Sequence, residues 1–375
     1  MKLVCRIALA VSLSVVGNSV SNCRADDENW TSLFNGKDLS GWVLVNTPAD
    51  TWTVQDGMLI CSGKPIGEIR TERMYQNFIL EIEWRHMVPR GNAGTFVWAD
   101  DITAKGVPFH RSVEVQVLEN AYGQSEHHTT HGDIFPIHGA KMSPLNGRGG
   151  NRAFPTEERS KPSPEWNHYR IECRNGDISL AVNGKVVTRG TQASPRKGYI
   201  CIESEGGVVH YRNAKIHVLP DTAVAAADVA IADRGYRSLY SGLDLRGWTT
   251  SDEGRQHWIA NDWILSYDEK AADGASATLT SSVSLQDQGF LLDLKPKEGF
   301  GGLSICGLKL PSQLTKSGEW HRIEGSVTSG MLTVSVDGHL VSEGTALPNS
   351  PVFALSVTGP ADFANIYVRP LKSTP

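Results

Sequence analysis

One short segment, residues 113–118, carries side chains suited to acid–base chemistry. In a strand its valines would lie on one face and Glu114 and Gln116 on the other, because successive side chains point to opposite faces. The valines predict a buried face. The other face would place a carboxylate beside an amide about 7 Å away, which suits the binding of sugar hydroxyls. A merely solvated strand face is the ordinary alternative.

Histidines are concentrated just after this segment, with five of the twelve in 29 residues: His110, His127, His128, His131 and His138. Histidine titrates near neutral pH and serves as a general base or a metal ligand. We therefore take His131 and His138 as candidate catalytic residues. The spacing of His127, His128 and His131 also permits a divalent metal ion, although no strong metal-binding signature is present. Incidental histidines in a polar loop are the alternative.

Four further polar residues are candidates for substrate binding. Glu83 lies on a strand whose alternate residues are apolar, and Asn92 follows in the next turn. Glu205 and Arg212 lie on two later strands that are close in sequence. Ion pairing across a sheet would explain such residues equally well.

The chain repeats itself. Residues 33–42 return as residues 239–248 with six of ten positions identical, and Arg170-Ile171-Glu172 returns as Arg322-Ile323-Glu324. The first pair of motifs lies 206 residues apart and the second pair 152, so the second copy lacks about 54 residues. The missing part corresponds to residues 81–166, which are rich in His, Glu and Arg. Chemistry is therefore expected in the first copy.

Short alternating segments separated by Asn-Gly, Asp-Gly and Gly-Gly, in a chain with 37 glycines and 18 prolines, predict an all-β fold. Two packed antiparallel sheets in each copy are the simplest arrangement, so we expect tandem jelly-roll β-sandwiches, the second shortened. The expected ranges are 30–220 for the first sandwich, 221–234 for a linker or short helical connection, and 235–372 for the second.

Residues 1–25 have the basic start and apolar run of a cleavable signal peptide, which predicts a periplasmic or extracellular protein. A lipoprotein anchored through Cys23 is the less favoured alternative. No later segment is long enough to span a membrane. The net charge of −5 argues against nucleic acid as a partner. Of the remaining cysteines, Cys173 and Cys201 would form a disulfide or stay buried as free thiols.

The first copy resembles the family of exported 3-keto-disaccharide hydrolase domains. The motifs that carry the resemblance are residues 33–42, 52–57, 91–94, 114–119, 165–167, 183–184 and 211–213. The resemblance implies a concanavalin A-like jelly roll that cleaves glycosides oxidised to a ketone at carbon 3. The second copy lacks the segment with Glu114 and Gln116 and is expected to be non-catalytic.

Such a reaction would need a base at carbon 2, a group that binds the enolate, and an acid for the leaving group. Under the resemblance, Glu114 or His131 would be the base, Gln116 and Arg212 would bind the enolate or the sugar hydroxyls, and His138 would be the acid. Two alternatives remain at this point: a non-catalytic, lectin-like carbohydrate-binding module, and a conventional glycosidase.

Overall fold

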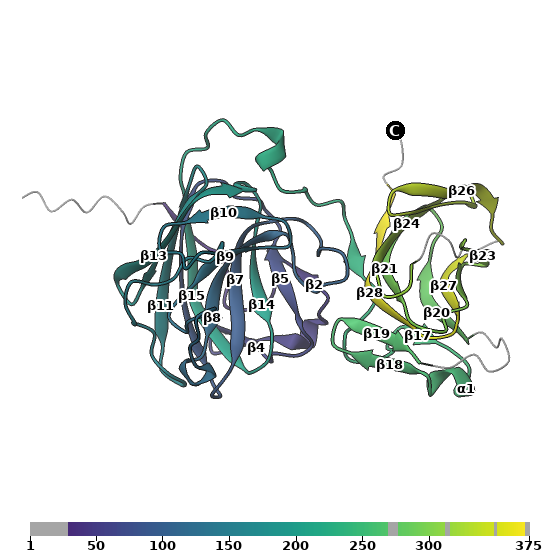
Figure 1. The fold of residues 1–375 in the computed structure, drawn as a ribbon, viewed down its shortest axis with the longest axis horizontal. Coiled ribbons are helices and arrows are strands. Elements are labelled where there is room, and N and C mark those ends of the chain that lie inside the picture. Colours follow the sequence, from purple (N-terminus) through teal and green to yellow (C-terminus); the bar gives the residue numbers. More distant parts are fainter. Residues whose placement is uncertain (1–28, 269–276, 312–315, 349–350, 372–375) are drawn as a thin grey trace, which may run out of the picture.

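The computed structural model describes residues 29–268, 277–311, 316–348 and 351–371, and it consists of two β-sandwiches placed side by side (Figure 1). The expected signal peptide lies outside the described residues. Each sandwich contains two antiparallel sheets, and the second sandwich has fewer strands. The prediction of tandem jelly-roll sandwiches, the second shortened, is confirmed.

The first sandwich pairs a nine-stranded sheet with a six-stranded sheet. The strands of the nine-stranded sheet, in spatial order, are β10 (Lys141–Pro144), β13 (Lys185–Ser194), β12 (Asp177–Val182), β11 (Asn167–Arg174), β6 (Phe78–His86), β15 (Val209–Val218), β4 (Met58–Cys61) and β3 (Trp52–Gln55), with β1 (Trp30–Ser32) beside β15. Those of the six-stranded sheet are β2 (Trp42–Val45), β5 (Gly67–Thr71), β14 (Tyr199–Ser204), β7 (Asn92–Ala99), β8 (Ser112–Leu118) and β9 (Ile134–Ile137).

The second sandwich repeats this plan with an eight-stranded and a five-stranded sheet. The first of these contains β18 (Trp258–Asn261), β19 (Ile264–Tyr267), β28 (Ala361–Pro370), β21 (Gln288–Pro296), β24 (His321–Thr328), β25 (Met331–Val336) and β26 (His339–Ala346), with β16 (Arg237–Ser238) beside β28. The other contains β17 (Trp248–Thr249), β20 (Ala277–Ser284), β27 (Val352–Thr358), β22 (Gly302–Ile305) and β23 (Leu308–Lys309).

Helical structure in the described residues is limited to single turns. They are the 3₁₀ turns η1 (Ala49–Thr51), η2 (Asn120–Tyr122) and η3 (Ala226–Asp228) and the short helix α1 (Asp252–Arg255). The other elements of the described residues are strands. Their period-two sequence pattern places alternate residues of facing strands in each core. Leu80, Ile82 and Trp84 of β6 pack in the same cluster as Val113 and Val115 of β8.

Strand pairing fixes how the two copies correspond. Trp84 pairs with Asn167 in the first sandwich, and Leu294 pairs with His321 at the same point of the second. Arg322 therefore corresponds to His168. The alignment of the two Arg-Ile-Glu motifs in the sequence analysis was wrong by two residues. A shift of two keeps each side chain on its face, which is why the sequence pattern did not expose the error.

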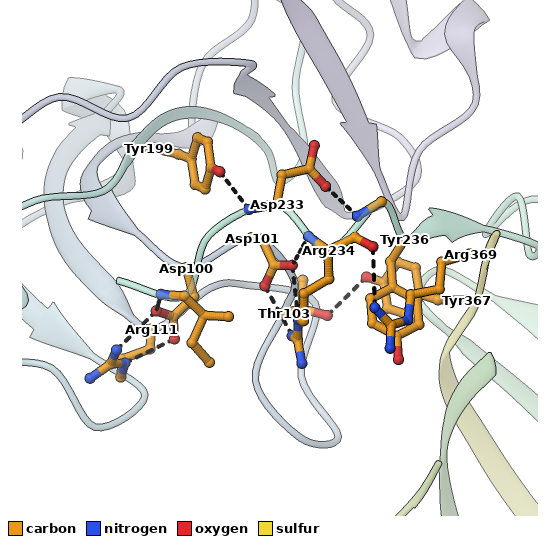
Figure 2. A network of polar contacts seen from close by, with 12 residues as sticks. Asp100, Asp101, Thr103, Arg111, Tyr199, Asp233, Arg234, Tyr236, Tyr367 and Arg369 are labelled. Carbon is orange, nitrogen blue, oxygen red and sulfur yellow. Dashed lines mark hydrogen bonds and ion pairs between the residues drawn. The ribbon is translucent and has the colours of Figure 1, made fainter. Parts of the chain in front are cut away.

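The segment between the sandwiches is fastened to the first one by two adjacent aspartates (Figure 2). Asp101, whose side chain is fully buried, accepts two hydrogen bonds from the guanidinium of Arg234, both at 3.0 Å. Asp100 accepts one from the backbone amide of Ile231 at 2.8 Å and pairs with Arg111 at 2.9 Å. The connection thus follows the surface of the first sandwich along a fixed path.

Residues 102–107, within the loop that joins β7 to β8, lie against the eight-stranded sheet of the second sandwich. Asn365 donates hydrogen bonds to the carbonyls of Ala104 and Val107, and Asp293 accepts one from the backbone amide of Gly106. The residues that hold this loop, which we call the loop socket, are Tyr236, Leu291, Asp293, Arg322, Asn365 and Tyr367. The socket joins the two sandwiches directly, in addition to the connecting segment.

Cys61, Cys173, Cys201 and Cys306 are all free thiols, and the first three are buried. Of the two alternatives left open by the sequence for Cys173 and Cys201, the structure has the unpaired one. Within the described ranges, no helix has the length and hydrophobicity needed to cross a membrane.

Candidate active site

The outward face of the six-stranded sheet in the first sandwich is polar, yet it is largely hidden from solvent. On β8, the valines enter the core, while Glu114 and Gln116 face away from it and are each only 6% exposed. Segments of the long connection between β8 and β11 reach this face: Asp133 accepts a hydrogen bond through its backbone carbonyl from Gln116, and Arg152 approaches the side chain of Gln116. Partial burial of charged groups on a strand face is typical of a site rather than of a wet surface.

Two carboxyl groups converge on a space left by a glycine. A Cβ atom on Gly94 of β7 would lie 3.0 Å from Oε1 of Glu114 and 2.9 Å from Oε2 of Glu203 on β14. That Oε2 atom is buried and has no hydrogen-bond partner within the described chain. The strand order β14-β7-β8 places the two glutamates on either side of Gly94.

Amide side chains connect this cluster to a third glutamate. Gln116 donates a hydrogen bond to Oδ1 of Asn92 at 2.9 Å, and Asn92 in turn donates to Glu205. Glu203 lies within reach of Glu205, and each affects the pKa of the other. Gln116, Asn92, Glu205 and Glu203 thus form a polar network, and Glu114 lies on the same face beside it.

A cation lies at the other end of the network. Arg152 donates hydrogen bonds to Gln116 at 3.3 Å and to the fully buried carboxylate of Asp133 at 3.0 Å. Its guanidinium stacks 3.4 Å above the ring centre of Phe135. These contacts fix the charge of Arg152 beside Glu114, where it can stabilise a developing negative charge.

The environment raises the pKa of all three glutamates. Burial is the main cause for Glu114, and repulsion from Glu205 adds to it, while Arg152 opposes it. Burial and then the charge of Glu114 raise the pKa of Glu203 well above its ordinary value. The pKa of Glu205 is raised by burial and held down by its hydrogen bonds from Glu203 and Asn92. Raised pKa values of this kind suit proton transfer near neutral pH.

A groove of about 380 Å³ opens onto this network. Asn92 and Glu205 form part of its wall, and Tyr122, which is 41% exposed, contributes an aromatic ring. The remaining wall is formed by Ile66, Val88, Pro89, Arg90, Gly91, Gly206 and Gly207. A volume of this size falls in the usual range for small-ligand sites.

The two candidate histidines lie apart from the glutamates. His131 is 5% exposed, with Nδ1 at 2.7 Å from the hydroxyl of Ser160 and Nε2 at 3.2 Å from Gln124. His138 is exposed after β9 and stacks against Phe109. In the described part of the chain, no hydrogen bond joins either histidine to Glu114.

The histidine cluster does not converge on a metal site. His127 and His128 are exposed or partly exposed and hydrogen-bond within their own turn through Ser125. Within the described residues, a single group brings three possible ligand atoms close together, namely Glu68, His110 and Cys201. In this group the carboxylate of Glu68 is bonded to Nδ1 of His110 at 2.7 Å.

Glu83 and Arg212 lie on the other side of the sandwich. They form an ion pair at 2.7 Å on the outward face of the nine-stranded sheet, across the core from Glu114. The structure thus brings together Glu114, Gln116, Asn92 and Glu205, but not Glu83 or Arg212. The reason is that alternation predicts which residues share a face of a strand and not which of the two sheets the strand joins.

Sequence reasoning missed four residues of this site: Gly94, Asp133, Arg152 and Glu203. Glu203 is two residues before Glu205, so strand alternation places both on one face, and this signal was available in the sequence. Gly94 lies in a strand interior, where a glycine often marks a close approach by another group. Arg152 and Asp133 are in an irregular connection, and no periodic pattern could assign them.

A comparison with protein families identifies the family of the first sandwich. The profile of the 3-keto-alpha-glucoside-1,2-lyase-like domain matches residues 29–217, half of the chain. The chain belongs to this family, and the resemblance seen in the sequence is confirmed. The match covers the first sandwich and not the second.

Solved structures of similar shape include a proposed glycosyl hydrolase from Parabacteroides distasonis, at 23% identity over 52% of this chain and 95% of that one, with a TM-score of 0.41. The carbohydrate-binding module CBM66 of Bacillus subtilis aligns at 12% identity over 47% of this chain and 96% of that one, with a TM-score of 0.34. The β-glucanase of Bacillus licheniformis aligns at 13% identity over 51% and 92%, with a TM-score of 0.32. No curated protein sequence matches the chain.

Proposed function

We propose that the first sandwich cleaves glycosides that carry a ketone at carbon 3, by elimination followed by hydration. One observation carries this proposal: the buried side chain of Glu114 shares a strand face with Gln116, to which the fixed cation of Arg152 donates a hydrogen bond. Burial also raises the pKa of Glu114. Family membership supports the choice of a 3-keto-glucoside as the substrate class.

The ketone acidifies the hydrogen on carbon 2, so a carboxylate can serve as the base. Glu114 takes this proton, and the bond electrons form an enolate on the oxygen at carbon 3. The enolate then collapses, the bond from carbon 1 to the aglycone oxygen breaks, and a double bond forms between carbons 1 and 2. Addition of water returns a hydroxyl to carbon 1 and a hydrogen to carbon 2, so the net reaction is hydrolysis.

The neighbouring side chains supply the remaining roles in this proposal. Arg152 stabilises the enolate oxygen, the role that the sequence analysis gave to Arg212. Glu205 faces the groove beside Glu203, whose pKa is more strongly raised, so a proton held by Glu203 can pass through Glu205 to the departing oxygen. Asn92 and Gln116 bind sugar hydroxyls through their amides.

The two candidate histidines, His131 and His138, are not catalytic residues in this proposal. His131, the alternative base in the sequence analysis, positions the connection that covers Glu114, since it contacts Ser160 and Gln124. His138 has no catalytic role in this proposal, because it lies beyond the other end of β9. The acid role expected for it passes to Glu205.

The direct test is exchange of the hydrogen on carbon 2. The mature chain is incubated in D₂O with 3-keto-trehalose and, separately, with trehalose, and both exchange and cleavage are followed by NMR. We expect exchange and release of 3-keto-glucose from the oxidised sugar alone. Glu114→Gln should lower both rates by about 100-fold or more, because general base catalysis typically contributes that much.

Each alternative predicts a different result. Exchange that survives Glu114→Gln would assign the base to another residue. Release of reducing sugar from unoxidised glycans would indicate a conventional glycosidase. Binding of sugar without exchange or cleavage of 3-keto-trehalose would indicate a carbohydrate-binding module.

A further inference from the structure

The loop socket of the second sandwich has a counterpart in the first. The strand pairs that align Leu294 with Trp84 also align each socket residue with one residue of the first sandwich. Tyr236 corresponds to Trp30, Leu291 to Glu81 and Asp293 to Glu83. Arg322 corresponds to His168, Asn365 to Asn213 and Tyr367 to Lys215. These six residues, together with Ser32 and Ala214, line an open pocket of about 370 Å³. The same position is therefore filled by a loop in one sandwich and open in the other.

The two positions share one central feature. Asn213 and Asn365 each lie at a bulge in the strand with φ of 52°, so their side chains project from a left-handed backbone. Asn213 donates a hydrogen bond to Glu83 at 2.8 Å, and Asn365 donates one to Asp293 at 2.7 Å. In the second sandwich this fixed pair binds the polar groups of the loop. The pair in the first sandwich is equally fixed and faces an open pocket.

A polypeptide loop would not fit the pocket of the first sandwich in the same way. Trp320 packs directly on Gly106 of the docked loop, whereas its counterpart Trp166 is covered by Arg212, whose guanidinium lies 3.9 Å from the ring centre. Arg212 takes the place of the small Ala364. The path that the loop follows in the second sandwich is thus occupied by a side chain.

The apolar part of the socket has also become polar. In the second sandwich, Ile102 of the loop packs against Tyr236, Leu291 and Tyr367. The first sandwich has a tryptophan, a glutamate and a lysine at those three positions. A ligand of this pocket must be polar over most of its surface and flat on the side that meets Trp30.

The carboxylates of the pocket are ionised and held in place. Partial burial raises the pKa of Glu81, but hydrogen bonds from Arg170 and Lys215 outweigh it and lower the pKa overall. Burial is likewise outweighed at Glu83 by Asn213 and Arg212. A carboxylate has about four acceptor positions, so ones already fixed by these partners can still accept hydrogen bonds from hydroxyl groups.

We propose that this pocket is a second carbohydrate-binding site, in which a sugar ring lies on Trp30 and its hydroxyls bind Glu81, Glu83 and Asn213. It lies on the face of the sandwich opposite to Glu114, so it binds a sugar without cleaving it. Tryptophan suits this role because it provides a large flat ring. Lys215 Nζ already lies 4.7 Å from the ring centre of Trp30, so in this proposal the sugar packs on the opposite face of the ring. The proposal does not depend on the cleavage reaction.

The test is binding of unoxidised trehalose, sucrose and cellobiose to the full chain, followed by NMR and by isothermal titration. We expect at least one sugar to bind with a dissociation constant of about 1–10 mM, which corresponds to a weak single-ring site. Trp30→Ala should weaken this binding at least tenfold and Glu81→Gln several-fold. Asn92→Ala at the other face should leave the component of binding that Trp30→Ala removes unchanged, and Trp30→Ala should leave turnover of 3-keto-trehalose unchanged.

Glu172→Gln is the matched control, because Glu172 is also paired with an arginine on β11 but does not line the pocket. The proposal fails if none of the three sugars binds, or if Trp30→Ala and Glu81→Gln leave binding intact. It also fails if Glu172→Gln weakens binding as much as they do. A synthetic peptide of residues 101–109 is tested alongside, and binding of this peptide in place of sugar would make the pocket a polypeptide-docking surface.

Discussion

Gly94 leaves room for the carboxyl group of Glu114: a Cβ atom at Gly94 would lie 3.0 Å from Oε1 of that glutamate. The φ angle of Gly94 is not in the left-handed region, so the glycine is needed for space and not for backbone conformation. The added methyl group of Gly94→Ala would press on the ring of Phe96, at 2.8 Å, and on the carboxyl groups of Glu203 and Glu114. A shift of about 1 Å in a catalytic group can cost about 100-fold in rate.

We therefore expect Gly94→Ala to lower kcat for 3-keto-trehalose by about 10- to 100-fold while the protein still folds. Circular dichroism and steady-state kinetics measure the two effects. Gly150→Ala is the control, because a Cβ atom there meets nothing within 4 Å. Full activity of Gly94→Ala would show that the position of Glu114 is not critical.

Activity should depend on pH through the carboxyl cluster. A base acts only when deprotonated, and burial raises the pKa of Glu114 above the ordinary glutamate value of about 4.3. The rate constant kcat/KM should therefore rise with pH along a limb whose midpoint lies well above that value. In the variant Glu205→Gln, which removes the charge that helps to raise the pKa of Glu114, the midpoint of the remaining activity should move to lower pH. A limb centred at the ordinary glutamate pKa would contradict the assignment.

The raised pKa values of the carboxyl cluster should also lower the stability of the folded protein as pH rises. A carboxyl group whose pKa is raised in the folded state binds protons more tightly there than in the unfolded chain, so the free energy of unfolding falls as pH rises above about 4.3. Burial and the charge of Glu114 raise the pKa of Glu203 well above the ordinary value. Glu203→Gln should therefore remove part of this loss of stability. Thermal unfolding should show the variant gaining on the parent protein between pH 5 and pH 8, by about 1–3 kcal/mol. A constant difference across this pH range would show that Glu203 is not protonated in the fold.

The loop docked in the socket should help to hold the two sandwiches in a fixed relative position. Gly106 has a φ of +74°, and a Cβ atom on it would lie 2.4 Å from the ring of Trp320. Gly106→Ala should release the loop from its socket, increase the radius of gyration in small-angle scattering and speed proteolysis of the connecting segment. Gly41→Ala is a matched control, since its φ of +88° is equally unfavourable but nothing lies within 4 Å. Equal behaviour of the two variants would mean that the contact with Trp320 is not needed.

Arg152 and Arg212 provide a paired test of which face is catalytic. Arg152→Met should lower kcat for 3-keto-trehalose by about 100-fold or more, as loss of a group that stabilises an oxyanion does. Arg212→Met should leave kcat unchanged, because its ion pair with Glu83 lies on the opposite sheet. The reverse result would move the reaction to the nine-stranded sheet.

Strand alternation explains what could be predicted from the sequence. It placed Glu114 and Gln116 together on the face opposite the valines, and the structure has them there because alternation is a local property of a strand. The turn signals are local in the same sense. The repeat of residues 33–42 as 239–248 can be read by comparing the sequence with itself, without knowledge of strand pairing.

Long-range strand pairing explains which features could not be predicted from the sequence. Glu203 meets Glu114 only because β14 pairs with β7 and β7 with β8, and neither pairing is encoded by spacing. Arg152 reaches Gln116 from an irregular connection. Glu83 was a candidate for substrate binding, but its strand β6 and the strand β8 of Glu114 belong to different sheets. A single sequence contains no signal that separates these cases.

The loop of residues 102–107 has a consequence for how this protein can be divided. It joins the two strands that bear Asn92 and Glu114, and Asn365 of the second sandwich holds it. A fragment ending near residue 220 would leave Asp101 buried without Arg234 and the loop without its partners. The family profile ends at residue 217, yet the sandwich that it covers depends on residues beyond that point for these contacts.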